Sequence, residues 1–228
     1  MNSVTSRLEK VRQRIQTAEQ EYHRVPGSVQ LIAVSKKQPV QAIEEAITAG
    51  QRVFAENYLQ DALPKLIALK GQNLEWHFIG DIQSNKTSDI ARHFDWVHCV
   101  SREKIARRLN DARGTAQAPL NVCLQVNISG EASKSGCTLA ELPMLAAVVS
   151  ALPNLQLRGL MVIPAHSDAF DAQRQPFHAL QQAFTELRAQ GYELDTLSMG
   201  MSNDMEAAIA EGATHVRIGT DIFGPRAV

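Results

Sequence analysis

Short apolar runs alternate with longer amphipathic segments along almost the whole chain. Strands separated by helix-length segments predict right-handed βαβ units and a parallel sheet. A helix is predicted before the first run, because Leu8, Val11, Ile15, Ala18 and Tyr22 recur at spacings of three and four. The eight strand-like runs are residues 29–35, 52–56, 75–80, 96–100, 120–128, 156–164, 195–201 and 214–220.

Eight strands favour a closed (β/α)8 barrel. An open doubly wound sheet is the alternative, but such sheets usually have about five or six strands. The chain has 228 residues, close to the roughly 250 of a typical barrel of this kind. No Pro-, Gly- or Ser-rich linker divides it. We therefore expect an α/β fold in which residues 1–228 form one TIM-type barrel domain with an extra N-terminal helix.

Composition narrows the class of protein. Hydrophobic residues make up 44% of the chain, enough for a packed core, and the net charge of −1 gives no basic face for nucleic acid. The first residues lack the apolar segment of a signal peptide, and no run approaches the length of a membrane span. We expect a cytoplasmic protein, without membrane or nucleic-acid partners, that works as a monomer. Cys99, Cys123 and Cys137 show no metal or disulfide spacing, so buried free thiols are expected.

In a barrel of this type the active site forms at the carboxyl ends of the strands, and a phosphate often binds after strands seven and eight. The loops expected there are GMSND, beginning at Gly200, and GTDIFG, beginning at Gly219. Glycine allows backbone N–H groups to approach an anion, and Ser202 and Thr220 add hydroxyl donors. The alternative is a pair of ordinary strand-to-helix turns with capping residues.

Lys36 directly follows an apolar run and shares a strand face with Ile32 and Val34. If that face is the barrel interior, its ammonium group lies at the barrel mouth. Desolvation lowers the pKa of a lysine, and a neutral amine adds to an aldehyde to give an imine. The alternative is that Lys36 starts a solvated loop, as we expect for Lys37.

Arg217 lies two residues before Gly219 in the last run. The last strand of a closed barrel neighbours the first, so an inward Arg217 would lower the pKa of Lys36 further. An arginine facing a pyridine nitrogen would also keep that nitrogen unprotonated and weaken the ring as an electron sink. The alternative is a surface arginine paired with an acid such as Glu211.

His77, His98 and His215 fall in or next to strand-like runs. A metal site needs two or three ligands that converge, and spacing alone does not show convergence. We expect hydrogen-bonded histidines of the core or the mouth, and no metal.

Seven stretches between Leu31 and Arg226 form a specific combination when taken in order. They are LIAVSKKQP, FAENYLQD, EWHFIGDIQSNK, VNISGEASKSG, LRGLMVIP, LSMGMSNDMEAAIAEGATHVRIGT and IFGPR. Together they resemble the pyridoxal phosphate homeostasis protein family (YggS/PROSC type). The resemblance implies a fold type III barrel, like the N-terminal domain of alanine racemase. The sequence departs from the family pattern at Ala55, where glycine is common. Asp221 is also notable, because its carboxylate should point away from a bound phosphate.

The resemblance also implies a cofactor and its contacts. The cofactor is pyridoxal 5'-phosphate, bound as a Schiff base on Lys36, with a further lysine, Lys134, near its entrance. Arg217 is implied beside the pyridine nitrogen. The other implied cofactor-binding residues are Asn57 and Met161 beside the ring, and Ser202, Gly219 and Thr220 with the backbone of Met201 at the phosphate.

Two functions are weighed. The first is a carrier that buffers the cofactor and passes it on, with apo-enzymes that depend on it as recipients. The second is an amino-acid racemase, which needs a base opposite Lys36; in alanine racemase this is a tyrosine from outside the barrel. Tyr22, Tyr58 and Tyr192 have no evident claim to that role, and we expect no second domain to supply one. We therefore favour the carrier. A barrel aldolase would also use a lysine and a phosphate clamp, but no acid/base partner is evident.

Overall fold

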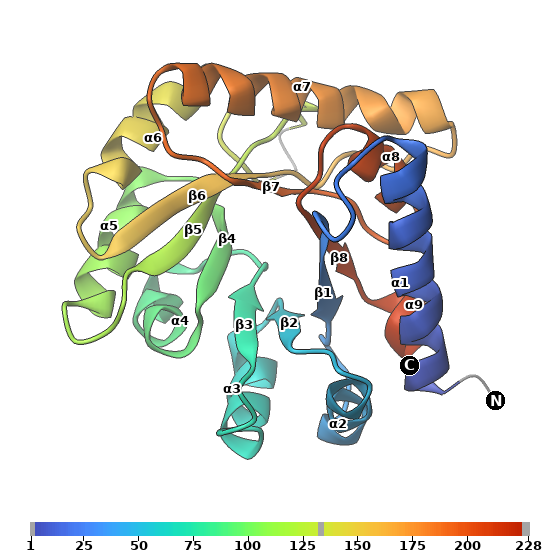
Figure 1. The fold of residues 1–228 in the computed structure, drawn as a ribbon. Helices are drawn as coiled ribbons and strands as arrows, with labels where there is room; N and C mark the ends of the chain where they lie inside the picture. Colours follow the sequence, from blue (N-terminus) through green and yellow to red (C-terminus); the bar gives the residue numbers. More distant parts are fainter. Residues whose placement is uncertain (1–2, 132–134, 225–228) are drawn as a thin grey trace.

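The computed structural model describes residues 3–131 and 135–224 of the chain. Within these residues, parallel strands close into one barrel in the order of the sequence, so the prediction of a (β/α)8 barrel is confirmed (Figure 1). The strands are β1 (Gln30–Val34), β2 (Val53–Glu56), β3 (Glu75–Phe78), β4 (Trp96–Val100), β5 (Leu120–Gln125), β6 (Leu155–Met161), β7 (Thr196–Ser198) and β8 (His215–Ile218).

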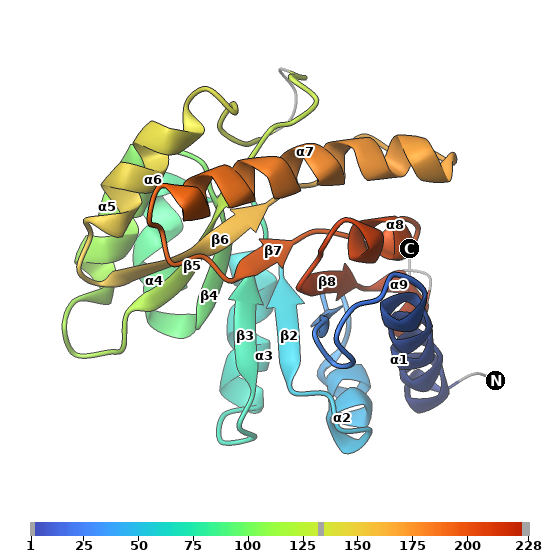
Figure 2. The same ribbon diagram turned by 45° about the horizontal axis from the view of Figure 1, so that its top comes forward.

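The helices cover the outside of the barrel. They are α1 (Val4–Glu21), α2 (Val40–Thr48), α3 (Leu59–Ala68), the 3-10 helix η1 (Ser84–Lys86), α4 (Thr87–His93), α5 (Glu103–Arg113), α6 (Leu142–Ser150), α7 (Phe170–Ala189), α8 (Met205–Ala210) and α9 (Thr220–Phe223). The predicted N-terminal helix is confirmed as α1, which packs beside α8 and α9 (Figures 1 and 2). Its apolar residues Leu8, Val11, Ile15 and Ala18 are buried. No helix in the described residues is both long and apolar enough to cross a membrane.

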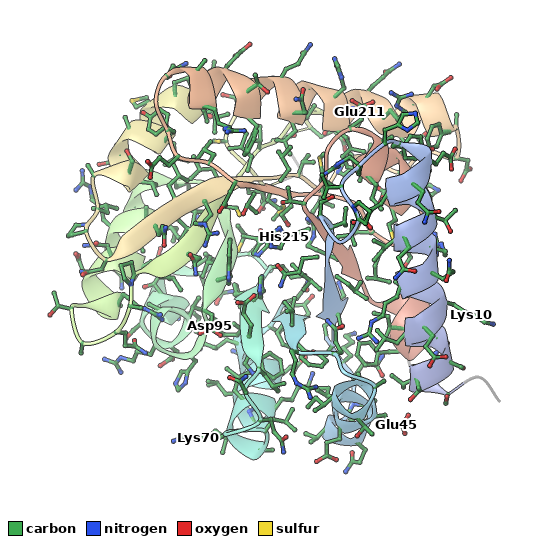
Figure 3. The ribbon with its side chains drawn as sticks, viewed as in Figure 1. Lys10, Glu45, Lys70, Asp95, Glu211 and His215 are labelled. Atoms are coloured by element: carbon green, nitrogen blue, oxygen red, sulfur yellow. The ribbon has the colours of Figure 1, made fainter. Side chains whose placement is uncertain are left out.

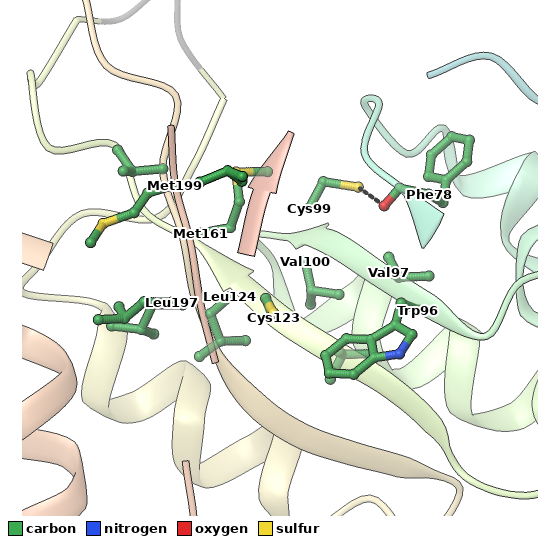
Figure 4. Close-up of a cluster of buried hydrophobic side chains, with 14 of the residues drawn as sticks. Phe78, Trp96, Val97, Cys99, Val100, Cys123, Leu124, Met161, Leu197 and Met199 are labelled. Atoms are coloured by element: carbon green, nitrogen blue, oxygen red, sulfur yellow. Dashed lines mark hydrogen bonds between the residues drawn. The ribbon is translucent and has the colours of Figure 1, made fainter. Parts of the chain in front are cut away.

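Most of the apolar core lies between the barrel and its helices, and Figure 4 shows part of it. The cysteines at 99, 123 and 137 are buried and free, as predicted. A smaller apolar cluster contains Ile32, Val34, Ala55 and Ile79. Because Ile32 and Val34 alternate with residues of the outer core, their side chains face the barrel interior, as the two-residue period predicts.

Polar side chains also occupy the barrel interior. His98 on β4 lies 2.7 Å from Ser198 Oγ on β7, and these strands are not neighbours, so the contact crosses the interior. His77 and His215 lie beside His98, with ring centroids 4.9 and 6.4 Å from it. Figure 3 shows His215 in the middle of the molecule. The three histidines therefore converge, but the described residues hold no group of side chains arranged to bind a metal.

Several predicted runs extend past the strands that form, those at 156–164 and 195–201 by three residues beyond the ends of β6 and β7. The run at 120–128 leaves the barrel after Gln125, because Asn127 N–H donates to the Cys137 carbonyl (2.8 Å) and Cys137 N–H donates to that of Gln125 (2.9 Å). Val126 N–H still donates to the Met161 carbonyl of β6 (2.9 Å), and beyond Val126 the chain pairs with the later loop. The GTDIFG segment, expected as a loop, contains the short helix α9.

Candidate functional site

A cavity of about 380 Å³ opens at the carboxyl ends of the strands. Sites for small molecules usually measure roughly 300–1,000 Å³, so it suits a ligand of modest size. Its lining comes from the ends of β1, β3 and β8 and from the segments that follow β2, β6 and β7. The lining residues are Val34, Lys36, Gln38, Asn57, Ile79, Ile163, His166, Met201, Ser202, Asn203, Asp204, Arg217, Gly219, Thr220, Asp221 and Gly224.

Most of the predicted site residues share this lining. It brings together Lys36, Asn57, Met201, Ser202, Arg217, Gly219 and Thr220. Met161 is fully buried at the end of β6 and does not line the cavity (Figure 4). Its register partner is Ser198, so its side chain faces the barrel interior. Lys134 lies outside the described residues.

The backbone that carries Lys36 is fixed by a buried polar cluster. Ser35 Oγ donates to Glu56 Oε1 (2.7 Å), and Lys65 Nζ donates to the same oxygen (2.7 Å) and to the Ser35 carbonyl (2.8 Å). Glu56 is fully buried and Lys65 is 6% exposed. Burial raises the pKa of Glu56, and the hydrogen bonds from Lys65 and Ser35 act against that shift. Removing either charge would leave the other buried and unpaired, so the cluster holds the strand end rigidly.

Arg217 lies inside the barrel, as one of the two sequence interpretations predicts. It pairs in register with Ile32 on β1 and is 3% exposed. Its Nη1 donates to Ser198 Oγ (2.7 Å) and its Nη2 to the Val162 carbonyl (2.9 Å). Burial lowers the pKa of Arg217 to about 10, so the group stays charged at neutral pH.

The alternative interpretation of Arg217, as a surface residue paired with Glu211, is wrong. Glu211 instead accepts hydrogen bonds from Arg174 (2.6 Å) and, at its other oxygen, from His178 (2.8 Å). Its partners therefore come from α7, on the outside of the barrel.

Asn57 presents an unused acceptor at the cavity. Its Oδ1 is buried without a hydrogen-bond partner among the described residues. Gly80 packs against the Asn57 backbone so closely that a Cβ at position 80 would lie 1.9 Å from the Asn57 carbonyl oxygen. A buried acceptor without a partner is unfavourable by about 1–3 kcal/mol, so a hydrogen-bond donor placed in the cavity beside Asn57 would be favourable.

The glycine at position 219 lets the end of β8 approach the end of β1. A Cβ there would lie 3.3 Å from the Val34 carbonyl oxygen, tighter than ordinary contact. Ser202 and Thr220 add hydroxyl groups to the same lining. The Met201 amide differs from expectation, because it donates to Asp204 Oδ1 (2.6 Å). In this structure that amide holds Asp204, whose pKa is raised by burial.

Ser202, Gly219 and Thr220 are called the phosphate clamp below. Arg14 lies next to this clamp, and the sequence pattern did not reveal it. From α1 it donates to Asp221 (2.5 Å), Glu206 (2.9 Å) and the Ser202 carbonyl (3.1 Å). Asp221 lines the cavity, but its charge is balanced by Arg14. Arg14 occupies one of many polar positions on an amphipathic helix, so only the packing of α1 beside α8 and α9 distinguishes it.

Comparisons with known proteins agree with the fold. The family model "Alanine racemase, N-terminal domain" matches residues 6–227. A protein of Pseudomonas aeruginosa named pyridoxal phosphate homeostasis protein is 55% identical over 226 residues, covering 99% of this chain and 97% of its own. One of the same name from Escherichia coli is 51% identical over 229 residues, covering 99% and 98%.

Solved structures show the same likeness. PipY of Synechococcus elongatus, in a structure with pyridoxal phosphate (PLP) bound, is 38% identical with a TM-score of 0.86, covering 97% of this chain and all of PipY. Alanine racemase of Corynebacterium glutamicum is 16% identical with a TM-score of 0.70, covering 96% of this chain and 62% of the enzyme. That second likeness shows a shared fold alone.

Proposed function

Because the chain belongs to the pyridoxal phosphate homeostasis protein family, we propose that it binds pyridoxal 5'-phosphate and serves to buffer and pass on this cofactor. The observation that carries the proposal is one cavity lined by an amine, a charged arginine and two hydroxyl groups. They come from Lys36, Arg217, Ser202 and Thr220. These groups are complementary to the aldehyde, the ring nitrogen and the phosphate of that molecule.

The residues present fit this cofactor. The unpartnered Asn57 Oδ1 requires a hydrogen-bond donor, and the ring hydroxyl of pyridoxal phosphate is one. Lys36 supplies the primary amine that covalent attachment needs. Ser202 and Thr220 donate hydrogen bonds to the phosphate, and Gly219 leaves room for it. Arg14 supports this clamp from behind by balancing Asp221.

Arg217 favours a carrier over an enzyme. When bound, the cofactor supplies an aldehyde for amines and a ring that withdraws electrons, most strongly when the ring nitrogen is protonated. Arg217 is charged and donates only, so toward that nitrogen it offers N–H groups and accepts no proton. The nitrogen stays unprotonated, and the ring withdraws electrons weakly.

The tyrosines also argue against a racemase of the alanine racemase type. Tyr22 ends α1 and stacks on Phe170, with ring centroids 6.3 Å apart. Tyr58 precedes α3 with 53% of its surface exposed, and Tyr192 packs on the outer core. No tyrosine belongs to the described lining of the cavity. A second base of the kind racemisation needs is therefore absent from that lining.

The double substitution Ser202→Ala and Thr220→Val is expected to weaken binding of pyridoxal phosphate at least tenfold. Each hydrogen bond to a charged group contributes about 1.5–3 kcal/mol, and both are removed. Fluorescence titration with pyridoxal phosphate and with unphosphorylated pyridoxal measures the effect. Pyridoxal should bind as before, and so should both ligands to the control Ser150→Ala with Thr185→Val, whose hydroxyls lie on exposed helix faces. Equal losses for both ligands would assign the two residues to the fold.

The loaded protein is expected to exchange the α-hydrogen of amino acids far more slowly than an enzyme does. The ring is a weak electron sink beside Arg217, and no tyrosine lies in the described lining. Deuterium incorporation into a panel of L-amino acids, followed by NMR, measures the rate. Exchange at about 1–1,000 per second, the range of typical enzymes, that disappears in Lys36→Ala would establish catalysis and overturn the proposal.

A further inference from the structure

A chain of hydrogen bonds runs through the barrel interior from the cavity to the opposite end. Arg217 Nη1 donates to Ser198 Oγ (2.7 Å). Ser198 Oγ lies 2.7 Å from His98 Nδ1, and His98 Nε2 lies 2.7 Å from His77 Nδ1. His77 Nε2 lies 2.8 Å from Oε1 of Glu75, the first residue of β3.

The chemistry at both ends fixes the direction of every bond. A carboxylate only accepts, so His77 carries its proton on Nε2 and donates it to Glu75. In a neutral His77 the Nδ1 atom is then an acceptor, so His98 carries its proton on Nε2 and donates it to His77 Nδ1. In a neutral His98 the Nδ1 atom is likewise an acceptor, so Ser198 Oγ gives its one hydrogen to it. Arginine only donates, so Ser198 Oγ accepts from Arg217, which agrees with the order that Glu75 requires.

Burial leaves these side chains no water molecules as alternative hydrogen-bond partners. His77, His98 and Ser198 are fully buried, so their hydrogen bonds are made within the protein. Burial lowers the pKa of both histidines, which stay neutral, while the hydrogen bond from His77 lowers the pKa of Glu75, which stays charged. A cation and an anion thus terminate a row of neutral groups whose dipoles all point the same way. Such chains polarise one another in a medium of low dielectric.

We propose that Glu75, His77, His98 and Ser198 form a positioning relay that fixes the orientation of Arg217 toward the ring of the bound cofactor. The relay rests on the proposed function only in the identity of that ligand. Because the hydrogen of Ser198 is committed to His98, its oxygen is held as an acceptor for Arg217. That bond and the one to the Val162 carbonyl fix the guanidinium plane, so the remaining N–H groups keep one direction in the cavity.

The relay has a signature in the protein without cofactor. Long-range ¹⁵N–¹H NMR should show His77 and His98 as neutral Nε2–H tautomers at pH 7, with ring protons shifted downfield and protected from exchange. His93, which is exposed at the end of α4 and lies outside the relay, is the internal control, and its ring N–H should exchange with solvent without protection. A proton on Nδ1 of either buried histidine, or a positive charge on one, would overturn the relay whatever ligand the cavity takes.

Its effect on the cavity is tested from the far end of the barrel. Glu75→Gln keeps the shape but removes the terminal charge, and should weaken binding of pyridoxal phosphate about fivefold, the lower end of typical coupling between distant sites. The absorption maximum of the bound cofactor should shift as well, because Arg217 acts on its ring. The control is Asp195→Asn, which removes a carboxylate immediately before β7 that binds Arg158 outside the relay and should change neither quantity.

The outcomes separate the relay from the proposed function. An unchanged dissociation constant and spectrum in Glu75→Gln would overturn the relay, as would equal effects in Asp195→Asn. Failure of the unsubstituted protein to bind pyridoxal phosphate would instead overturn the proposed function and the relay's role in it, and the tautomers would still report whether the hydrogen-bond chain exists.

Discussion

Replacing Lys36 with alanine is expected to abolish covalent attachment of pyridoxal phosphate and to leave the fold intact. Attachment through the aldehyde requires a primary amine. Lys36 lines the cavity two residues beyond the end of β1, outside the apolar core, so losing its side chain opens no hole there. The preceding backbone remains fixed by Glu56 and Lys65. Borohydride reduction followed by peptide mass spectrometry locates the adduct, and circular dichroism checks the fold.

Lys37→Ala is the matched control for this substitution. Lys37 is adjacent and exposed and does not line the cavity, so the adduct should persist on Lys36. If mass spectrometry of the unsubstituted protein found the adduct mainly on Lys37 or Lys134, the assignment of Lys36 would be wrong. If Lys36→Ala lost its native circular dichroism signal, the lysine would have a structural role.

The fold could be predicted from the sequence because each strand of a parallel barrel is a separate apolar run. The run that becomes β1 also revealed which face is inside, since Ile32 and Val34 alternate with outer-core residues. The end of β5 could not be predicted. Val126 continues the apolar run, but its backbone follows Cys137 in the next loop. Helix α9 was missed because four residues are too few to show a helical period.

The site was predictable where it follows directly from strand order. Lys36 follows β1 and Arg217 lies in β8, and these two strands close the barrel, so their sharing one cavity follows from the topology. The contacts of Ser198 with His98 and Arg217 did not follow. The alternation of apolar and polar residues predicts whether a side chain points into or out of the barrel. Contact between two inward side chains also requires that they lie at the same level along the barrel axis, and that level is set by the stagger of the strands.

Acid is expected to unfold this protein through its three core histidines. His77 and His98 are fully buried and His215 is 8% exposed. Burial lowers the pKa of all three, that of His215 to about 3. The folded protein therefore keeps them neutral under mildly acidic conditions. The unfolded chain exposes the same imidazoles, whose ordinary pKa is about 6.5.

The sign of the pH dependence follows from this difference. Below about pH 6.5 the unfolded state binds protons that the folded state does not, so stability falls as the pH falls. Each histidine contributes about 1.4 kcal/mol per pH unit until its folded pKa is reached. Between about pH 6.5 and 4.5 His215 alone removes up to roughly 2.7 kcal/mol, and His77 and His98 act in the same direction. That loss is a sizeable part of the whole stability of a typical domain, about 5–15 kcal/mol.

Urea unfolding at a series of pH values measures the effect, because the slope of the unfolding free energy against pH counts the protons taken up. His215→Gln, which lies outside the hydrogen-bond chain to Glu75, should lower the uptake near pH 5 by about one proton. The control is His93→Gln, which replaces an exposed histidine outside the buried cluster and should not reproduce the effect of His215→Gln. An uptake that His215→Gln does not alter would mean that His215 is already protonated in the folded barrel. Its Nε2, which has no partner among the described residues, would then hold a buried charge, contrary to the lowered pKa inferred from its burial.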